Sequence, residues 1–480
     1  MDAYFKSKNY KYLFFTLFIF TVTPILFSKI NLIGNHEIPN YLINFDNLYS
    51  YIIGHDEINF LIETENQRYR PSFYIIKGLE YFIFKDSHFL TFFYKFILSL
   101  FIAFMIFKIN EKLFEKRKTI FLSSASIILF PTNYDIFSRL DVQEFYFLIF
   151  FFPLFFLILK NNTEFDRGRN LSNDVYILLL SIIIIGIKEN LVFHFLIFIL
   201  SIFIFNLKLN FFKNKIYYFY FFFIICLYFY KFFLVYNNVG ASAYDLEFNH
   251  NKLIILLKNF PLQNILNPML LLSWTLIIYL NFKKKIKLIH FKFFIILSFH
   301  IIFDYLFYQG IGSYRHYIIG LICLIYILAI LYDNYIFRWK LISDSKIYLN
   351  FSLFSLILFL SIIQFSLNLK MTIQNNKEHK ILKTIYSSQE SLILNNEHID
   401  EKVIAIAYFS KFYKPHKNVF FLYDNKLVEF TDINLKFKFK YPSSILDIDK
   451  KKYECLVFSD NSNLYMCNSI VYFPKEIDLF

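Results

Sequence analysis

Four segments of the 480-residue chain place acidic and basic side chains between long apolar runs. Charged groups at the level of a membrane interface cost about 2.5–3.5 kcal/mol each on insertion scales, so they usually line a cavity, pair or take part in function. Arg and Lys suit the binding of a phosphate group, and a carboxylate suits a general base. The candidates in chain order are Asp46, Asp56, Glu57, Arg68 and Arg70; Asp135, Arg139, Asp141 and Glu144; Lys188, Glu189 and His194; and Asp304, Arg315 and His316.

Three of these candidates also have a simpler explanation. The pair Lys188-Glu189 could be a hairpin tip among lipid headgroups, and Arg139 could extend to a lipid phosphate. A lone His194 is more often a packed histidine than a ligand or a base. Both signs of charge at four separate segments favour instead one polar cavity at one face of a membrane.

Composition indicates which kind of protein positions these residues. The chain is 57% hydrophobic and 18% charged, with 68 Phe and 37 Tyr, which excludes an ordinary soluble domain. The net charge of +13 comes from short clusters without a basic face, so nucleic acid is not expected as a partner. Cys226 and Cys323 fall in apolar runs, whereas Cys455 and Cys467 lie in a polar region and could pair in an oxidising compartment.

The apolar residues form blocks of about 15–22 residues, close to the length that crosses a bilayer as a helix. The pattern predicts an all-α polytopic membrane bundle of about 11 transmembrane helices. The predicted spans are 12–27, 89–107, 119–133, 143–159, 175–187, 191–207, 216–236, 265–282, 293–308, 317–332 and 347–367.

Loop charge assigns the sides of the membrane, because cytoplasmic loops attract Lys and Arg. The start of the chain is basic, and it predicts a cytoplasmic N-terminus. Every second loop after it is basic as well, and the loops between them are poor in Lys and Arg. The basic loops are 108–118, 160–169, 208–215, 283–287 and 338–346, and the others are 30–71, 132–141, 237–261 and 309–316.

The segment LLLSIIIIGIKENLVFHFLIFIL (178–200) carries Lys188-Glu189 inside an apolar run. As one span, 175–207 would be about 50 Å long, beyond a hydrocarbon core of about 30 Å. It would also place two basic clusters on the outer side. Two short spans are therefore predicted, with residues 188–190 as an outer tip that dips into a cavity.

The same count places everything after residue 367 outside. We predict a transmembrane domain over 1–369, with a long first outer loop at 30–88, and a small α/β C-terminal extracytoplasmic domain over 370–480. Strand-like runs in the second domain are VIAIAYF, NVFFLYD, LKFKFKY and ECLVFSD. In the first outer loop, SFYIIKGLEYFIF (72–84) predicts a helix lying in the interface.

A phosphate anchor, a carboxylate base and tyrosines that can stack on sugar rings are the parts needed to move a sugar from a lipid phosphate. With this layout, the chain resembles the C-type (GT-C) membrane glycosyltransferases, the group with protein O-mannosyltransferases and aminoarabinose transferases. The first-loop acid of that family is similar to Asp46 in FDNLYSY or to Asp56-Glu57 in GHDEINF. Its Arg-Pro element resembles Arg70-Pro71 in RYRPSFYII. SRLDVQEFYF, GIKENLVF and SYRHYIIG resemble the Arg/Gln-Glu, Lys-Glu and late Arg elements of bacterial members.

The resemblance implies an inverting transfer in a bacterial cytoplasmic (inner) membrane. The donor would be a sugar on a polyprenyl phosphate, and the acceptor a glycan, a lipid or a protein outside. Asp46 is slightly favoured as the base, with Asp56 and Glu57 as alternatives, and Arg139, Lys188 and Arg315 would hold the lipid phosphate. Some members use a divalent metal, and this sequence has no decisive metal cluster. The other substrate-binding candidates are Arg68, Arg70, Glu144, Glu189 and His316.

Two other functions fit the same composition. A polysaccharide polymerase or ligase also joins lipid-linked sugars outside, although its basic residues usually lie in large loops between late spans. A transporter or flippase of lipid-linked sugars would need polar residues near the middle of the membrane. The spans offer few such charges, of which Lys95 and Lys231 are isolated.

Overall fold

The computed structural model describes the chain in several stretches, and every structural statement below concerns those residues. They are 9–30, 70–84, 87–130, 133–140, 142–163, 171–188, 194–195, 222–223, 225–227, 229, 263–307, 318–334, 345–387, 391–395, 418–423, 426–429, 455–459, 462–467 and 470–472.

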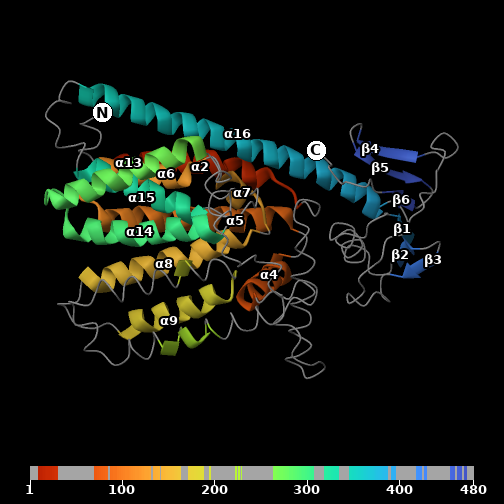
Figure 1. The fold of residues 1–480 in the computed structure, drawn as a ribbon. Coiled ribbons are helices and arrows are strands. Elements are labelled where there is room, and N and C mark those ends of the chain that lie inside the picture. The colour runs from red at the N-terminus through yellow and green to blue at the C-terminus, as the bar shows by residue number, and fades with distance from the viewer. Residues whose placement is uncertain are drawn as a thin grey trace.

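Apolar helices form an elongated bundle, and one long helix leads from it to a small β-sheet (Figure 1). The helices are α2 (Asn9–Val22), η1 (Thr23–Phe27), α4 (Pro71–Phe84), α5 (His88–Leu113), α6 (Arg117–Ile128), α7 (Asn133–Ser138), α8 (Gln143–Thr163), α9 (Leu171–Ile185), α13 (Gln263–Phe282), α14 (Leu288–Phe307), α15 (Ile318–Asn334) and α16 (Ser345–Ser387).

The long helix α16 lies beside α2 and η1 and runs in the same direction. The side-chain amide of Asn368 donates to the Thr21 carbonyl at 2.7 Å, and that of Asn375 donates to Ser28 Oγ at 2.8 Å. These amides satisfy polar groups where the first helix ends, a place where carbonyls lack partners within the helix. Because residue numbers rise together along both helices, Asn9 lies at the bundle end opposite the sheet (Figure 1). We call these two ends the N-terminal end and the sheet end.

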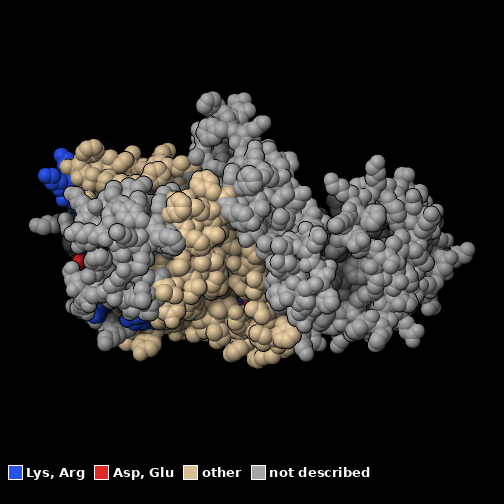
Figure 2. Space-filling view, turned by 90° about the horizontal axis from the view of Figure 1, so that it is seen from below, with Lys and Arg blue, Asp and Glu red and all other residues tan. Residues whose placement is uncertain are grey.

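Ion pairs join several helices at the N-terminal end. Lys11 Nζ lies 2.5 Å from Glu111 Oε1, which connects α2 to α5. Lys287 Nζ lies 2.7 Å from Glu115 Oε1 and lowers the pKa of that carboxyl. The start of the chain and two of the loops predicted to be cytoplasmic, 108–118 and 283–287, thus meet at one end, where Figure 2 shows blue Lys and Arg side chains.

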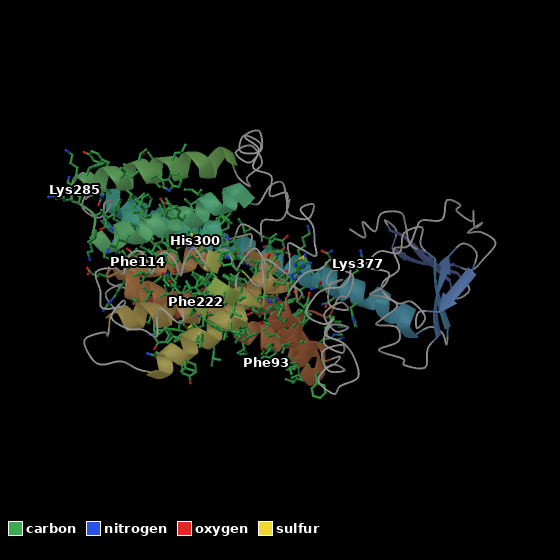
Figure 3. The ribbon with its side chains drawn as sticks, turned by 60° about the horizontal axis from the view of Figure 1, so that its bottom comes forward. Phe93, Phe114, Phe222, Lys285, His300 and Lys377 are labelled. Carbon is green, nitrogen blue, oxygen red and sulfur yellow. The ribbon has the colours of Figure 1, made fainter. Side chains whose placement is uncertain are left out.

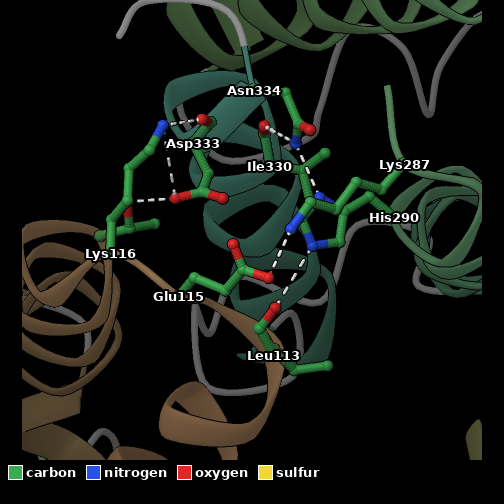
Figure 4. A network of polar contacts seen from close by, with 9 residues as sticks. Leu113, Glu115, Lys116, Lys287, His290, Ile330, Asp333 and Asn334 are labelled. Atoms are coloured by element: carbon green, nitrogen blue, oxygen red, sulfur yellow. Dashed lines mark hydrogen bonds and ion pairs between the residues drawn. The ribbon is translucent and has the colours of Figure 1, made fainter. Parts of the chain in front are cut away.

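A second network lies beside these pairs (Figure 4). Thr119 Oγ1 donates to Asp333 Oδ1 at 2.9 Å, and Lys116 donates to the backbone carbonyl of Asp333. His290 lies 3.2 Å from the Leu113 carbonyl and 2.7 Å from the Asn334 side-chain amide. The network fixes the turn between α5 and α6 against the end of α15.

At the sheet end, histidines bring the start of α5 to α16. The Ile30 N–H donates to His88 Nδ1 at 3.2 Å, and His379 Nδ1 lies 3.1 Å from the Ile30 carbonyl. The two imidazole rings meet edge to face with centroids 4.3 Å apart. The chain that leaves η1 is thereby held between two helices.

Helix α5 shows how the bundle meets its surroundings. Phe92, Ile102 and Ile106 are buried, whereas Phe93 and Phe104 are 42% and 45% exposed. Figure 3 shows Phe93 at the edge of the bundle. Phe89, Ile97 and Phe101 are exposed as well, at spacings of three or four residues along the same helix. An exposed apolar face of this kind suits contact with lipid tails and marks a membrane or protein contact surface.

The described helices agree with most of the predicted spans. Three are long and apolar enough to cross a membrane: Asn9–Phe27, His88–Leu113 and Ser352–Lys377. Shorter apolar helices are Gln143–Leu157, Val175–Ile185, Leu271–Phe282, His290–Ile302 and Ile318–Asn334. The predicted span 119–133 contains only the 12-residue helix α6, which ends at Ile128 before Pro131. The spans predicted at 191–207 and 216–236 lie largely outside the described residues.

The C-terminal region contains a six-stranded mixed sheet of order β3-β2-β1-β6-β5-β4. β1 pairs in parallel with β2 and β6, and the other neighbours are antiparallel. The runs NVFFLYD and ECLVFSD are strands as predicted, whereas VIAIAYF and LKFKFKY lie outside the described residues. The predicted boundary at 369/370 falls within α16, and its place stays a prediction. The strands are β1 (Ser391–Asn395), β2 (Asn418–Tyr423), β3 (Lys426–Glu429), β4 (Cys455–Ser459), β5 (Ser462–Cys467) and β6 (Ile470–Tyr472).

Candidate functional site

A buried ion pair joins α9 to α8 at the sheet end. Lys188 Nζ lies 2.5 Å from Glu144 Oε1, and the two side chains are only 8% and 2% exposed. Glu144 lies in the first turn of α8, where the positive end of the helix dipole favours a carboxylate. Lys188, predicted as the outer tip of a hairpin, is thus directed into the protein.

The backbone before Lys188 adopts a turn that also receives α4. Helix α9 ends at Ile185, and the Gly186 carbonyl accepts hydrogen bonds from the N–H groups of Ser72 and Phe73 at 3.0 and 3.3 Å. These N–H groups belong to the first turn of α4, which has no intrahelical acceptor for them. A Cβ on Gly186 would overlap Ser72 Oγ, so the close approach of the two segments requires glycine.

A second polar cluster lies between α4 and α8. Lys77 Nζ lies 2.8 Å from Glu80 Oε2 and donates to the Tyr146 hydroxyl at 2.6 Å. The Tyr146 hydroxyl donates to Glu80 Oε1, also at 2.6 Å. Lys77 is 5% exposed and Tyr146 is 3% exposed, so the triad lies inside the protein.

A third lysine approaches the same turn of α8 from α5. The Nζ atom of Lys95 lies 4.4 Å from the centroid of the Phe145 ring, a cation–π contact, and Lys95 is 2% exposed. Three successive residues at the start of α8 therefore each contact a different buried lysine. We call this arrangement the lysine cluster: Glu144 with Lys188, Phe145 with Lys95, and Tyr146 with Lys77 and Glu80.

Two predicted arginines lie near this part of the fold. Arg70 precedes α4 and is 2% exposed. Arg139 Nη1 lies 3.7 Å from Asp135 Oδ1, four residues earlier, and both side chains are about one-fifth exposed. Burial raises the pKa of the adjacent Tyr134 hydroxyl, so this phenol stays protonated.

Of the eleven residues expected to act in catalysis or in substrate binding, the structure places four: Arg70, Arg139, Glu144 and Lys188. It also places the charged candidates Asp135 and His194. It brings Glu144 and Lys188 together across 44 residues of sequence. The remaining predictions lie outside the described residues, and they stay predictions. These are Asp46, Asp56, Glu57, Arg68, Glu189, Arg315 and His316.

Sequence reasoning missed Lys77, Glu80 and the role of Tyr146. A signal was present, because Lys77 and Glu80 are three residues apart on a predicted helix, a spacing that brings side chains together. The contact with Tyr146 spans 69 residues of sequence and has no local signature. Lys95 was noted only as an isolated charge in a predicted span, and its ammonium lies over the Phe145 ring at the start of α8.

A pair of histidines lies deeper in the bundle. The Nδ1 atoms of His194 and His300 are 3.1 Å apart, the rings are stacked, and both residues are buried. His300 also lines a small apolar hollow of about 40 Å³, together with Cys323 and Tyr326. Within the described part of the chain, no group of three or more His, Cys, Asp or Glu is arranged to hold a metal ion.

No protein-family model matches the sequence, and no curated protein matches it. Among solved structures, the chain is similar to ArnT from Cupriavidus metallidurans, which was crystallised with undecaprenyl phosphate bound. The two chains share 9% sequence identity, and the match covers 88% of this chain and 87% of that chain with a TM-score of 0.49.

Proposed function

We propose that this protein is a membrane glycosyltransferase that moves a sugar from a polyprenyl-phosphate donor to an acceptor on the outer face of the membrane. The observation that carries this proposal is the lysine cluster at the start of α8. Its members come from four helices or helix ends, yet they converge on residues 144–146. Such convergence of buried charge is costly, which is typical of a functional site.

Charge favours a phosphate as the ligand. Among the described residues, the lysine cluster and Arg70 contribute four cations, namely Lys77, Lys95, Lys188 and Arg70, against the two carboxylates Glu80 and Glu144. A lipid phosphate would add negative charge beside these four cations through charge-assisted hydrogen bonds. The phosphate also gains negative charge as its bond to the sugar breaks, so fixed cations would stabilise the transition state.

In the proposed reaction, an acceptor hydroxyl oxygen attacks the anomeric carbon while the bond from that carbon to the phosphate oxygen breaks. The hydroxyl proton passes to a first-loop carboxylate, for which Asp46, Asp56 and Glu57 are the candidates. Lys188, Arg139 and Arg315 would bind the departing phosphate, and Lys77 would be oriented by Tyr146 and Glu80. The remaining predicted residues Arg68, Glu189 and His316 would line the same site.

We further propose that the sheet end faces the outside of a bacterial inner membrane. The basic loops and Asn9 would then lie in the cytoplasm, and the C-terminal sheet would lie outside. Parallel α2 and α16 support this orientation, because the N-terminal end and the sheet are at opposite ends of the bundle.

The test is turnover by the full-length protein in lipid nanodiscs supplied with a panel of polyprenyl-phosphate sugars. The wild-type protein should release polyprenyl phosphate and form a glycosylated acceptor. The exchange variant Glu144→Lys/Lys188→Glu keeps an ion pair but moves the cation, and it should lower turnover by about 100-fold. The control Lys283→Ala removes an exposed cation at the N-terminal end and should leave turnover unchanged. Full activity in the exchange variant, with a donor that the wild type uses, would reject the role of Lys188.

The carboxylates are tested in the same assay. Turnover should be lost in at least one of Asp46→Asn, Asp56→Asn and Glu57→Gln, with expression unchanged. Full activity in all three would exclude a first-loop base.

A transporter or flippase of lipid-linked sugars is a second candidate, which the buried His194–His300 pair favours. Polar groups inside the bundle are what such a protein uses to pass a polar headgroup across the membrane. The two functions differ in one product. A flippase moves the intact donor between leaflets, whereas a transferase releases polyprenyl phosphate. A polysaccharide polymerase or ligase would instead join lipid-linked glycans to each other.

A further inference from the structure

A hollow of about 680 Å³ lies at the N-terminal end, far from the lysine cluster. It is bounded by the start of α2, the turn from α5 to α6, and the start of α14. The 26-residue helix α5 separates it from the sheet end by about 39 Å. Figure 3 shows Phe114, which lines the hollow, and Lys285 at the end of the molecule opposite Lys377.

Cations dominate the rim of this hollow. Lys112, Arg117 and Lys287 line it, and so do the carboxylates of Glu111 and Glu115. Lys11 and Lys108 bind Glu111 at 2.5 and 2.9 Å, while Lys287 binds Glu115 at 2.7 Å. The hollow itself is lined by three of these cations and two carboxylates, and Lys11 and Lys108 add two further positive charges beside Glu111.

The start of α6 adds to this positive field. Its N-cap residue Lys116 makes no side-chain capping bond, and its first turn contains no acidic residue. Arg117 and Lys118 stand there instead, at the positive end of the helix dipole, where an anion is favoured and a cation is not. A bound anion would place negative charge at this end of α6, where it interacts favourably with the helix dipole.

Lys284, in the neighbouring turn between α13 and α14, has a backbone conformation that is unfavourable for residues other than glycine. Lys284 has φ of 54°, in the left-handed region that glycine normally occupies after a helix. The backbone N–H of Lys285 donates to the Leu280 carbonyl at 2.8 Å, and that of Lys284 donates to the Asn281 carbonyl at 2.9 Å, which together close the helix end. A lysine in this position strengthens the positive potential of the same end.

We propose that this hollow binds a ligand through its phosphate group, independently of the transfer reaction proposed above. Lys112, Arg117 and Lys287 would contact the phosphate oxygens. The floor contains Phe114, Ile120 and Phe293, so an apolar part of the ligand would also be accommodated. The volume is many times that of a phosphate ion, and it lies within the range of ligand pockets, about 300–1,000 Å³. The phosphate could belong to the headgroup of an anionic lipid or to a soluble compound, and the two differ in their requirement for a bilayer.

The experiment uses the full-length protein in nanodiscs of phosphatidylcholine. Two probes are titrated: phosphatidylglycerol, followed by native mass spectrometry, and inorganic pyrophosphate, followed by thermal shift. Preferential retention of phosphatidylglycerol identifies a lipid headgroup site, and saturable binding of pyrophosphate without it identifies a site for a soluble phosphate. Binding of neither probe would overturn the proposal.

Two variants locate the binding. Lys112→Ala/Arg117→Ala should weaken binding of the active probe by about 30-fold. The matched control Lys283→Ala/Lys285→Ala removes two exposed cations at the same end outside the hollow, and it should change binding by less than about threefold. Equal losses in both variants would indicate a diffuse charge effect and contradict a defined site.

A variant that is expected to bind more tightly distinguishes a change in the site from misfolding of the protein. Glu115 is 81% exposed and pairs with Lys287, so Glu115→Gln would leave the fold intact and release the Lys287 ammonium for the ligand. This change should strengthen binding several-fold. Unchanged or weaker binding by a stable Glu115→Gln protein would contradict the assignment of Lys287.

Discussion

Lys188 Nζ lies 2.5 Å from Glu144 Oε1, and this pair connects the turn after α9 to the first turn of α8. Both groups are almost fully removed from solvent, and each compensates charge on the other. The pair thereby fixes the position of an ammonium group at the sheet end. It is also the contact on which the proposed binding of a lipid phosphate most depends.

Removing one side chain of the Lys188–Glu144 pair should destabilise the protein. Lys188→Ala removes the ammonium that pairs with the buried Glu144 carboxylate, and we expect a loss of about 3–5 kcal/mol. The exchange variant Glu144→Lys/Lys188→Glu should recover most of this loss, less about 0.3–1 kcal/mol for a lysine at a helix N-terminus. Thermal unfolding in detergent measures both. An exchange variant as unstable as Lys188→Ala would contradict a pairwise role.

Gly186 should be intolerant of even a methyl group. Gly186→Ala places a Cβ against the side chain of Ser72 and disturbs two hydrogen bonds to α4, so we expect a loss of about 1–3 kcal/mol. Adding Ser72→Gly removes the overlapping atoms and should restore part of the stability. If Gly186→Ala is as stable as the wild type, α4 does not approach the turn as closely as described.

The Tyr146 hydroxyl should contribute to the stability of the protein through its hydrogen bonds with Lys77 and Glu80. Tyr146→Phe leaves Lys77 and Glu80 with each other but removes the bridging group, and we expect a loss of about 1–3 kcal/mol. Tyr12 is 72% exposed, so Tyr12→Phe serves as the control and should be within about 0.5 kcal/mol of the wild type. Equal stability of the two variants, measured by thermal unfolding, would show that the hydroxyl bridge is unimportant.

The C-terminal cysteines provide a test of orientation. Cys455 and Cys467 are opposite each other in the register of β4 and β5, where Cα atoms lie about 4.5–5.5 Å apart, within the range of disulfides. If this domain lies outside, the two should be linked in protein made by a host with an oxidising periplasm. Alkylation before and after reduction, read by mass spectrometry, reveals the link. Two thiols alkylated without reductant would contradict an outer location.

Several features of the fold follow from the sequence because they depend on local patterns. The end of α9 before Lys188 follows from span length and loop charge, and the helix at Pro71–Phe84 follows from its amphipathic pattern. The short α6 does not, because apolar residues continue past Ile128 while the helix ends before Pro131. Local pattern sets where helices occur, and tertiary packing sets their ends.

The composition of the site was predictable only in part. Lys188 and Glu144 were both recognised as site candidates, but their pairing was not. Glu144 lies 44 residues from Lys188 along the chain, and packing of α8 against α9 brings the two together, whereas Glu189 lies outside the described residues. The lysine cluster was missed for the same reason, since Lys77 and Lys95 approach α8 from separate helices. The polar network at the N-terminal end likewise joins residues up to 217 positions apart.

We propose above that the sheet end binds the phosphate of a polyprenyl lipid, and a cryo-electron microscopy structure of the full-length protein in nanodiscs with polyprenyl phosphate would test this binding. We expect phosphate density within hydrogen-bonding distance of Lys188 Nζ, with Glu144 still in contact with the same ammonium. Phosphate density located elsewhere on the protein, with the lysine cluster unchanged and distant from it, would contradict the claim.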